Sequence, residues 1–193
     1  MPVNKWKIAF FLLAALIVTG VLAFIFWISR PVAGTPLPEA APASTGVDRL
    51  TVTATREDLE GIANTYIRQA INNDRIPVTL EFEDDVLLVS ELTVFAVQLP
   101  VMMHFEPVVL EDGNLSLKQK SVEVGNLTIP PSTILKLLGD TVGLPAWMIV
   151  RPKEEELFID LSRLPVSGGI QVRAKEINLP DDEIELEILI PRK

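Results

Sequence analysis

The 193-residue chain contains no cysteine and a single histidine, His104. Without a thiol the chain can form neither a disulfide nor the lipid-modified cysteine of a lipoprotein. One histidine cannot complete a Ser-His-Asp triad unless a carboxylate and a nucleophile arrive from distant parts of the chain, and no Gly-x-Ser-x-Gly motif is present. His104 lies among apolar residues, so we interpret it as structural. We therefore expect a protein that is not an enzyme and that carries no cofactor.

Basic side chains are also scarce, at 17 against 26 acidic ones. Three of them, Lys5, Lys7 and Arg30, precede Pro31, and no acidic residue does. The rest of the chain therefore has 14 basic and 26 acidic side chains, a net charge of −12. A surface of this sign repels nucleic acid and the anionic face of a membrane. We expect no nucleic-acid partner, and a soluble body that stands off the membrane surface.

Charge is absent altogether from residues 8–28, a run of 21 residues. As an α-helix this run would be roughly 31 Å long, which matches the hydrocarbon core of a bilayer. Lys5 and Lys7 precede the run and Arg30 follows it, so the positive-inside rule predicts a cytoplasmic N-terminus. The alternative is a cleaved signal peptide with a small-residue site at residues 41–43. Because a signal peptide has an apolar region of only about 7–15 residues, we expect an uncleaved anchor.

Composition divides the chain into three parts. Residues 1–30 are predicted to be a cytoplasmic tip and a transmembrane anchor, which makes the cytoplasmic membrane a partner through residues 8–28. Residues 31–47 contain four prolines, four alanines and no aromatic residue, and are predicted to be a semi-extended stalk. Residues 48–193 have the length of one domain with its own core, which we expect outside the cytoplasmic membrane. Because the chain lacks cysteine, we favour a Gram-positive cell envelope.

The expected fold of residues 48–193 is α+β, a mostly antiparallel curved β-sheet packed around one long amphipathic helix. The first folded element is this helix, which begins at Thr55 with Asp58 at the fourth position of a capping box. Residues 72–74 (NND) end it, and Pro77 prevents its continuation. Its apolar residues recur at helical spacing, at Leu59, Ile62, Ala63, Tyr66, Ile67, Ala70 and Ile71. Alternating apolar residues predict about seven strands, over residues 78–82, 86–97, 101–110, 115–124, 157–161, 170–174 and 184–190.

Local signals refine this outline. Asp112-Gly113 predicts a β-hairpin, and the phase of the apolar residues changes near residues 118–121, which predicts a bulge or bend there. Residues 130–132 (PPS) open a short helix over residues 133–138, which Gly139 is expected to close.

The domain has more large apolar side chains than one helical stripe needs. A curved sheet around a helix can leave a dry slot, the usual form of a site for an apolar ligand. Trp147 and Met148 are placed in a loop bounded by residues 143–145 and Pro152, at the rim of such a slot. The alternative is that each of these residues simply packs in a filled core. The candidate ligand-binding residues are Phe82, Phe105, Trp147, Met148 and Phe158.

Other candidates have a weaker basis. Ser132 and Lys136 have the spacing of a Ser–Lys pair on one helical face, but the companion motifs of acyl-enzymes are absent, so an N-cap and a solvated lysine are favoured. The acidic groups at residues 81–85 and 181–183 lack the order of a calcium loop. Charges at the edge of a strand usually serve to prevent its pairing with another molecule. We interpret these acidic groups in that way and expect no metal site.

Four passages resemble the YpmS family of uncharacterised membrane-anchored proteins of Gram-positive bacteria. They are residues 4–7 (NKWK), 127–130 (LTIP), 144–150 (LPAWMIV) and 177–184 (INLPDDEI). The resemblance covers nearly the full chain and implies the anchor and the domain plan. It implies no catalytic residue.

The sequence therefore favours a single-pass envelope protein that binds a lipid or another apolar envelope component without turning it over. The alternative is an interaction module that docks an envelope enzyme or assembly at the membrane.

Overall fold

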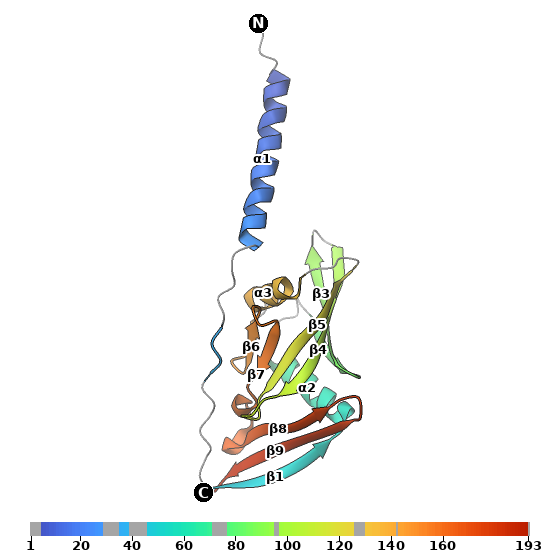
Figure 1. Cartoon of the computed structure of the whole chain (residues 1–193), viewed down its shortest axis with the longest axis vertical. Helices are drawn as coiled ribbons and strands as arrows, with labels where there is room; N and C mark the ends of the chain where they lie inside the picture. Colours follow the sequence, from blue (N-terminus) through green and yellow to red (C-terminus); the bar gives the residue numbers. More distant parts are fainter. Residues whose placement is uncertain are drawn as a thin grey trace. The chain divides into compact units, whose positions relative to one another are not determined.

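The computed structural model describes residues 5–28, 35–38, 46–70, 77–94, 97–125, 130–141 and 143–192 (Figure 1). It forms two compact units, Met1–Ala33 and Gly34–Lys193. Of the predicted stalk, residues 31–47, the structure describes residues 35–38, 46 and 47, and the rest lies outside the described residues.

The first unit contains helix α1, Lys5–Ile28. The side chains described in this helix are those of Trp6, residues 10–23 and Phe26. Its large apolar side chains are exposed, among them Phe10, Leu12 and Leu16. Over the residues that the structure describes, no helix is both long and apolar enough to cross a membrane.

The second unit contains two antiparallel sheets (Figure 1). Six strands make the larger sheet, in the order β2 (Val78–Phe82), β3 (Val86–Val94), β4 (Val97–Val109), β5 (Leu115–Val124), β7 (Glu156–Ile159) and β6 (Met148–Arg151). Three strands make the smaller one, in the order β1 (Val47–Ala54), β9 (Glu183–Pro191) and β8 (Gln171–Asn178). This confirms the α+β class and the antiparallel pairing.

The prediction of one curved sheet was wrong, and so was the prediction that a helix is the first element of the domain. Strand β1 precedes that helix and pairs with β9 at the far end of the chain, from Val47 opposite Pro191 to Ala54 opposite Ile184. The segment of residues 47–54 (VDRLTVTA) is short and half of its residues are polar. Its partner strand lies far along the chain, so the local pattern of apolar residues did not indicate a strand there.

Helix α2, Arg56–Ala70, has the predicted capping box. The Asp58 amide donates to Thr55 Oγ1 (3.2 Å), and the Thr55 amide donates to Asp58 Oδ2 (3.1 Å). Asp182, in the β8–β9 turn, accepts a further hydrogen bond from the Arg56 amide (2.6 Å). The N-terminus of α2 is thus held both by its own cap and by the smaller sheet.

The side chains of α2 also cover the outer edge of β2. Asn64 accepts from the Leu80 amide (2.9 Å) and donates to the Leu80 carbonyl (2.7 Å), and Glu60 accepts from the Phe82 amide (3.0 Å). Two residues four apart on a helix are about 6 Å apart, as are two residues two apart on a strand. Glu60 and Asn64 can therefore hydrogen-bond to the backbone of Phe82 and Leu80 at the same time. These bonds fix the height of α2 over the six-stranded sheet.

Helix α3, Pro131–Thr141, does not end at Gly139 as predicted. The helix continues past this glycine to Thr141, and α3 packs against β6 there: a Cβ added at Gly139 would lie 3.5 Å from Val150 Cβ, an ordinary van der Waals contact. Two 3₁₀ turns, Leu161–Arg163 and Ser167–Gly169, lie between β7 and β8.

Two local predictions are confirmed in the larger sheet. Gly113 has φ +80° in the β4–β5 hairpin, and its carbonyl accepts from the Ala174 amide of β8 (2.8 Å). The adjacent residues His104 and Phe105 of β4 pair with Ser121 and Gln119 of β5. Lys120, between Gln119 and Ser121, is therefore the extra residue of a bulge. The hairpin therefore links the two sheets.

Candidate apolar binding site

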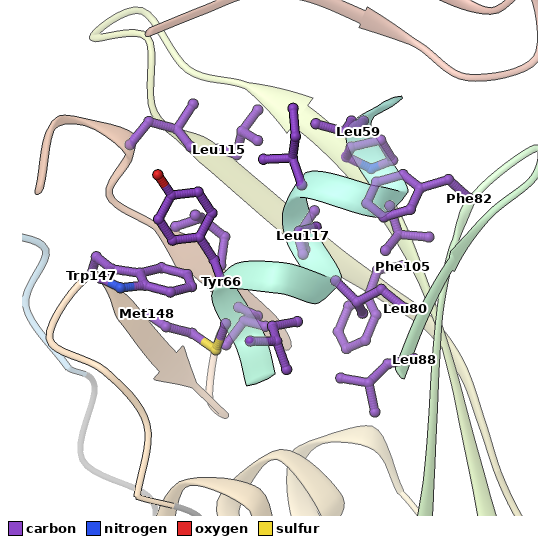
Figure 2. Close-up of a pocket in the computed structure, with 18 of the residues that line it drawn as sticks. Leu59, Tyr66, Leu80, Phe82, Leu88, Phe105, Leu115, Leu117, Trp147 and Met148 are labelled. Atoms are coloured by element: carbon purple, nitrogen blue, oxygen red, sulfur yellow. The ribbon is translucent and has the colours of Figure 1, made fainter. Parts of the chain in front are cut away.

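A cavity of about 150 Å³ lies between α2 and the inner face of the six-stranded sheet (Figure 2). The surface that it exposes is wholly apolar. Helix α2 lines it with Leu59, Ile62, Ala63, Tyr66 and Ile67. The larger sheet contributes Val78, Leu80, Phe82, Val86, Leu88, Phe105, Pro107, Leu115, Leu117, Met148, Leu157 and Ile159. The other lining residues are Leu138, Leu144, Trp147, Leu161, Leu164 and Ile177.

The period of two along the strands explains this lining. Leu115 and Leu117 of β5 and Leu157 and Ile159 of β7 face the cavity, because alternate residues of a strand share one face. On α2 the lining residues follow the helical spacing predicted from the sequence, from Leu59 to Ile67. The cavity is therefore the space that remains where a straight apolar stripe meets an apolar sheet face.

The structure brings together four of the five predicted site residues. Phe82, Phe105, Trp147 and Met148 all line the cavity, whereas Phe158 does not. In Figure 2, Trp147, Met148 and Tyr66 lie at one end of the view, and Phe82 and Phe105 lie at the other. Phe158 lies on β7 between the cavity-lining Leu157 and Ile159, on the opposite face of the sheet, and is only 1% exposed.

The prediction that Trp147 and Met148 lie in a loop was wrong for Met148, whereas Trp147 does lie in the turn just before β6. Trp147 is only 8% exposed and its carbonyl accepts from the Asp160 amide (2.8 Å), while Met148 is the first residue of β6. Strand β6 has only four residues, with Gly143 and Pro145 before it and Pro152 after it, so the sequence indicated a loop. Leu138 and Ile177 are cavity residues that the sequence did not indicate, because they reach the site from α3 and β8 through tertiary packing.

The size and lining of the cavity suit an apolar group. A cavity of about 150 Å³ lined by aliphatic and aromatic side chains stays dry and can take up benzene-sized molecules. Water gains nothing there, since it needs two to four polar partners. A whole lipid would not fit in this volume, but the end of a hydrocarbon chain would.

Charged groups gather on the outer face of the same sheet. Glu156 is buried, accepts a hydrogen bond from Ser116 Oγ (2.6 Å) and contacts both Lys118 and Arg151. Burial by itself would raise the pKa of Glu156. The hydrogen bonds from Lys118 and Ser116 and the charges of Lys118 and Arg151 outweigh it and hold this pKa below its ordinary value. Since the carboxylate is neutralised, we assign this group to stability.

The remaining polar candidates form no recognisable catalytic or metal site. His104 Nδ1 of β4 lies 3.1 Å from Oδ1 of Asp85, which lies in the turn between β2 and β3. Ser132 and Lys136 lie one turn apart on α3, both half-buried. Within residues 5–28, 35–38 and the other described ranges, no group of three or more His, Asp or Glu side chains could hold a metal ion.

Comparison with known proteins assigns the chain to a family. Residues 4–190 match the model of a family described as an uncharacterised protein conserved in bacteria (DUF2140), so the chain belongs to that family. The uncharacterised protein YpmS of Bacillus subtilis (strain 168) is 29% identical over 190 residues, which cover 98% of this chain and all of that protein. This confirms the resemblance to the YpmS family. No solved structure matches the chain.

Proposed function

We propose that this protein is a single-pass membrane protein of the bacterial envelope whose extracytoplasmic unit binds the hydrocarbon part of a lipid or another apolar envelope component. The cavity between α2 and the six-stranded sheet carries the proposal, because its exposed surface is wholly apolar and its volume is about 150 Å³. Binding takes place without chemical change to the ligand.

The proposed anchor is residues 8–28. This run has no charged side chain, and basic residues precede it at Lys5 and Lys7. Phe10, Leu12 and Leu16 of α1 are exposed, and the described side chains of this helix other than Thr19 are apolar. Hydrocarbon surroundings would remove this surface from water, and the charge bias would place the N-terminus in the cytoplasm.

The character of the lining indicates which part of a ligand is bound. No polar surface is exposed in the cavity, so it offers nothing that could recognise a headgroup or a sugar. Binding a hydrocarbon end would gain about 0.8 kcal/mol for each buried CH₂ group. The ligand class that fits is therefore an acyl or prenyl chain, entered by its end, with its polar part outside.

The test uses Trp147 as a reporter inside the cavity. With Trp6 and Trp27 replaced by phenylalanine, Trp147 is the one tryptophan of the chain. We expect a fatty acid brominated near its methyl end to quench Trp147 in the full chain in detergent micelles, since bromine quenches indole on contact.

Filling the cavity provides the matched control. Ala63→Leu places a larger side chain in the lining, and we expect it to abolish the quenching and to raise the free energy of unfolding by about 1 kcal/mol. Gln69→Leu adds an apolar side chain at an exposed position of α2 and should leave the quenching unchanged. Equal quenching in the Ala63→Leu variant and the parent would contradict binding in this cavity.

A second function is supported by the outer edge of β1. Within the described part of the chain β1 pairs with β9 alone, so its other edge can accept a strand from an envelope enzyme or assembly. Cross-linking in cells from this edge, with benzophenone at Thr51, tests the idea. A reproducible protein neighbour combined with absent Trp147 quenching would favour this docking function over lipid binding.

A further inference from the structure

The chain that follows α1 is attached to the second unit before β1 begins. Arg151 Nε donates a hydrogen bond to the carbonyl oxygen of Thr35 (3.1 Å). Arg151 ends β6, an edge strand of the six-stranded sheet, and its side chain is 17% exposed. Thr35 and Pro38 are half-buried in the same unit. Residues 35–38 are therefore a strap, and the predicted stalk does not run free from α1 to β1.

Arg151 is a rigid attachment point. Its guanidinium contacts Glu156 and lies 3.3 Å from Glu154 Oε1, so two carboxylates fix its plane while Nε is left for Thr35. Glu156 is in turn fixed by Ser116 and Lys118. The charged groups on the outer face of the sheet thus orient Arg151 so that Nε can donate to one backbone carbonyl of the strap.

The strap changes the length of chain between the anchor and the body. Only residues 29–34 separate Ile28 from Thr35, and this segment can extend to at most about 25 Å. Without the strap the tether would run from Ile28 to Val47 and could extend to about 65 Å. The attachment point would then also move from β6 to β1.

We propose that the strap shortens the tether between the proposed anchor and the body to residues 29–34, so that the cavity beside Trp147 and Met148 takes up a hydrocarbon chain from the bilayer that holds the anchor. Met148 is on the same strand as Arg151, about 10 Å away along it, and lines the cavity. The inference rests on the proposed function, and it names the ligand as a chain of a bilayer lipid taken up close to the anchor.

Two insertions of equal length distinguish a strapped tether from a free one. Twenty Gly/Ser residues inserted after Ala33 lengthen the tether in front of the strap, raising its root-mean-square reach from about 15 to about 29 Å. The same insertion after Ala41 follows the strap and leaves that tether unchanged. A dye on Lys153→Cys, an exposed position in a chain without other cysteines, reports energy transfer to acceptor lipids in phosphatidylglycerol vesicles.

We expect the insertion after Ala33 to lower energy transfer about two-fold and the insertion after Ala41 to leave it unchanged. Arg151→Lys keeps the charge that Glu156 needs but removes Nε, so it should make the two insertions equivalent, while Arg163→Lys should not. Equal loss from both insertions in the parent chain would overturn the strap.

Trp147 quenching separates this inference from the function on which it rests. With vesicles of brominated phosphatidylglycerol, quenching should fall with the insertion after Ala33 and persist with the insertion after Ala41. Unequal energy transfer without any quenching of Trp147, in vesicles or by the brominated fatty acid in micelles, would retain the strap and overturn lipid binding. Quenching that neither insertion changes would overturn the dependence of lipid uptake on the short tether.

Discussion

The two faces of the sheet formed by β5, β7 and β6 are both buried, but their side chains have different surroundings. Leu157 faces inward and is 2% exposed, while its neighbour Phe158 faces outward and is 1% exposed. The inner face borders a dry cavity. The outer face buries Ser116 and Glu156, whose hydrogen bonds and ion pairs are satisfied. Burial alone therefore does not mark a binding residue, and what matters is whether space adjoins the side chain.

The largest expected change in the free energy of unfolding comes from truncating Leu157 and Phe158, one at a time. Phe158→Ala should lower the free energy of unfolding by about 4 kcal/mol, because a fully packed aromatic ring is removed. Leu157→Ala should cost less, about 2–3 kcal/mol, because part of its surface already faces the cavity. Urea titration of the full chain in micelles, followed by Trp147 fluorescence, measures both.

The same two variants separate packing from binding. Leu157→Ala enlarges the cavity and should strengthen quenching by the brominated fatty acid, whereas Phe158→Ala should leave it unchanged in the folded protein. A change in quenching with Phe158→Ala alone would show that the outer face, not the cavity, holds the ligand.

The second prediction concerns the charges of the outer face. Glu156→Ala should lower the free energy of unfolding by about 3 kcal/mol, because the half-buried Arg151 would lose its closest carboxylate. Glu187→Ala provides the comparison. Glu187 pairs at 3.5 Å with Arg49, whose side chain is 60% exposed, and its loss should cost under about 1 kcal/mol. Similar costs for the two variants would refute a structural role for the outer-face cluster.

The smallest expected effect is on pH dependence. The pKa of Glu156 is lower in the folded protein than its ordinary value of 4.5, so the folded state favours the ionised carboxylate. Its contribution to stability is present above pH 4.5 and is lost as the pH falls through the lower, folded-state pKa. In urea titrations between pH 7 and pH 3, Glu156→Gln should therefore show a shallower loss of stability on acidification.

Asp58 also contributes to the loss of stability on acidification, in both the parent chain and the Glu156→Gln variant. Its pKa is also lowered, by hydrogen bonds from the Thr55 side chain and amide, so its contribution has the same sign and remains in the Glu156→Gln variant. An unchanged slope in Glu156→Gln would show that the outer-face carboxylate is not coupled to folding.

Several elements could be predicted because their causes are local. The capping box of Thr55 and Asp58, the hairpin at Gly113 and the bulge at Lys120 each depend on residues a few positions apart. The stripe from Leu59 to Ile67, which became one wall of the cavity, was visible for the same reason. Of the four proposed site residues that line the cavity, Phe82, Phe105 and Met148 lie on strands, and Trp147 directly precedes one.

The misplaced elements depend on contacts between distant parts of the chain. Strand β1 needs β9 as its partner, and α3 continues past Gly139 to Thr141, where it packs against β6. Phe158 has the same type and neighbourhood in the sequence as a cavity residue. Its face was decided by the register of β7 on β5, where it lies opposite Ser116.

By itself, the sequence determined the uncharged run at residues 8–28, the acidic balance of the rest, the capped helix and the alternating strands, because side-chain chemistry and local spacing are written directly in the chain. Tertiary structure decided that the strands divide into two sheets, that Asn64 and Glu60 set α2 over β2, and that Arg151 holds Thr35. A cavity is the volume left when such elements meet, so it exists only once their separation is fixed.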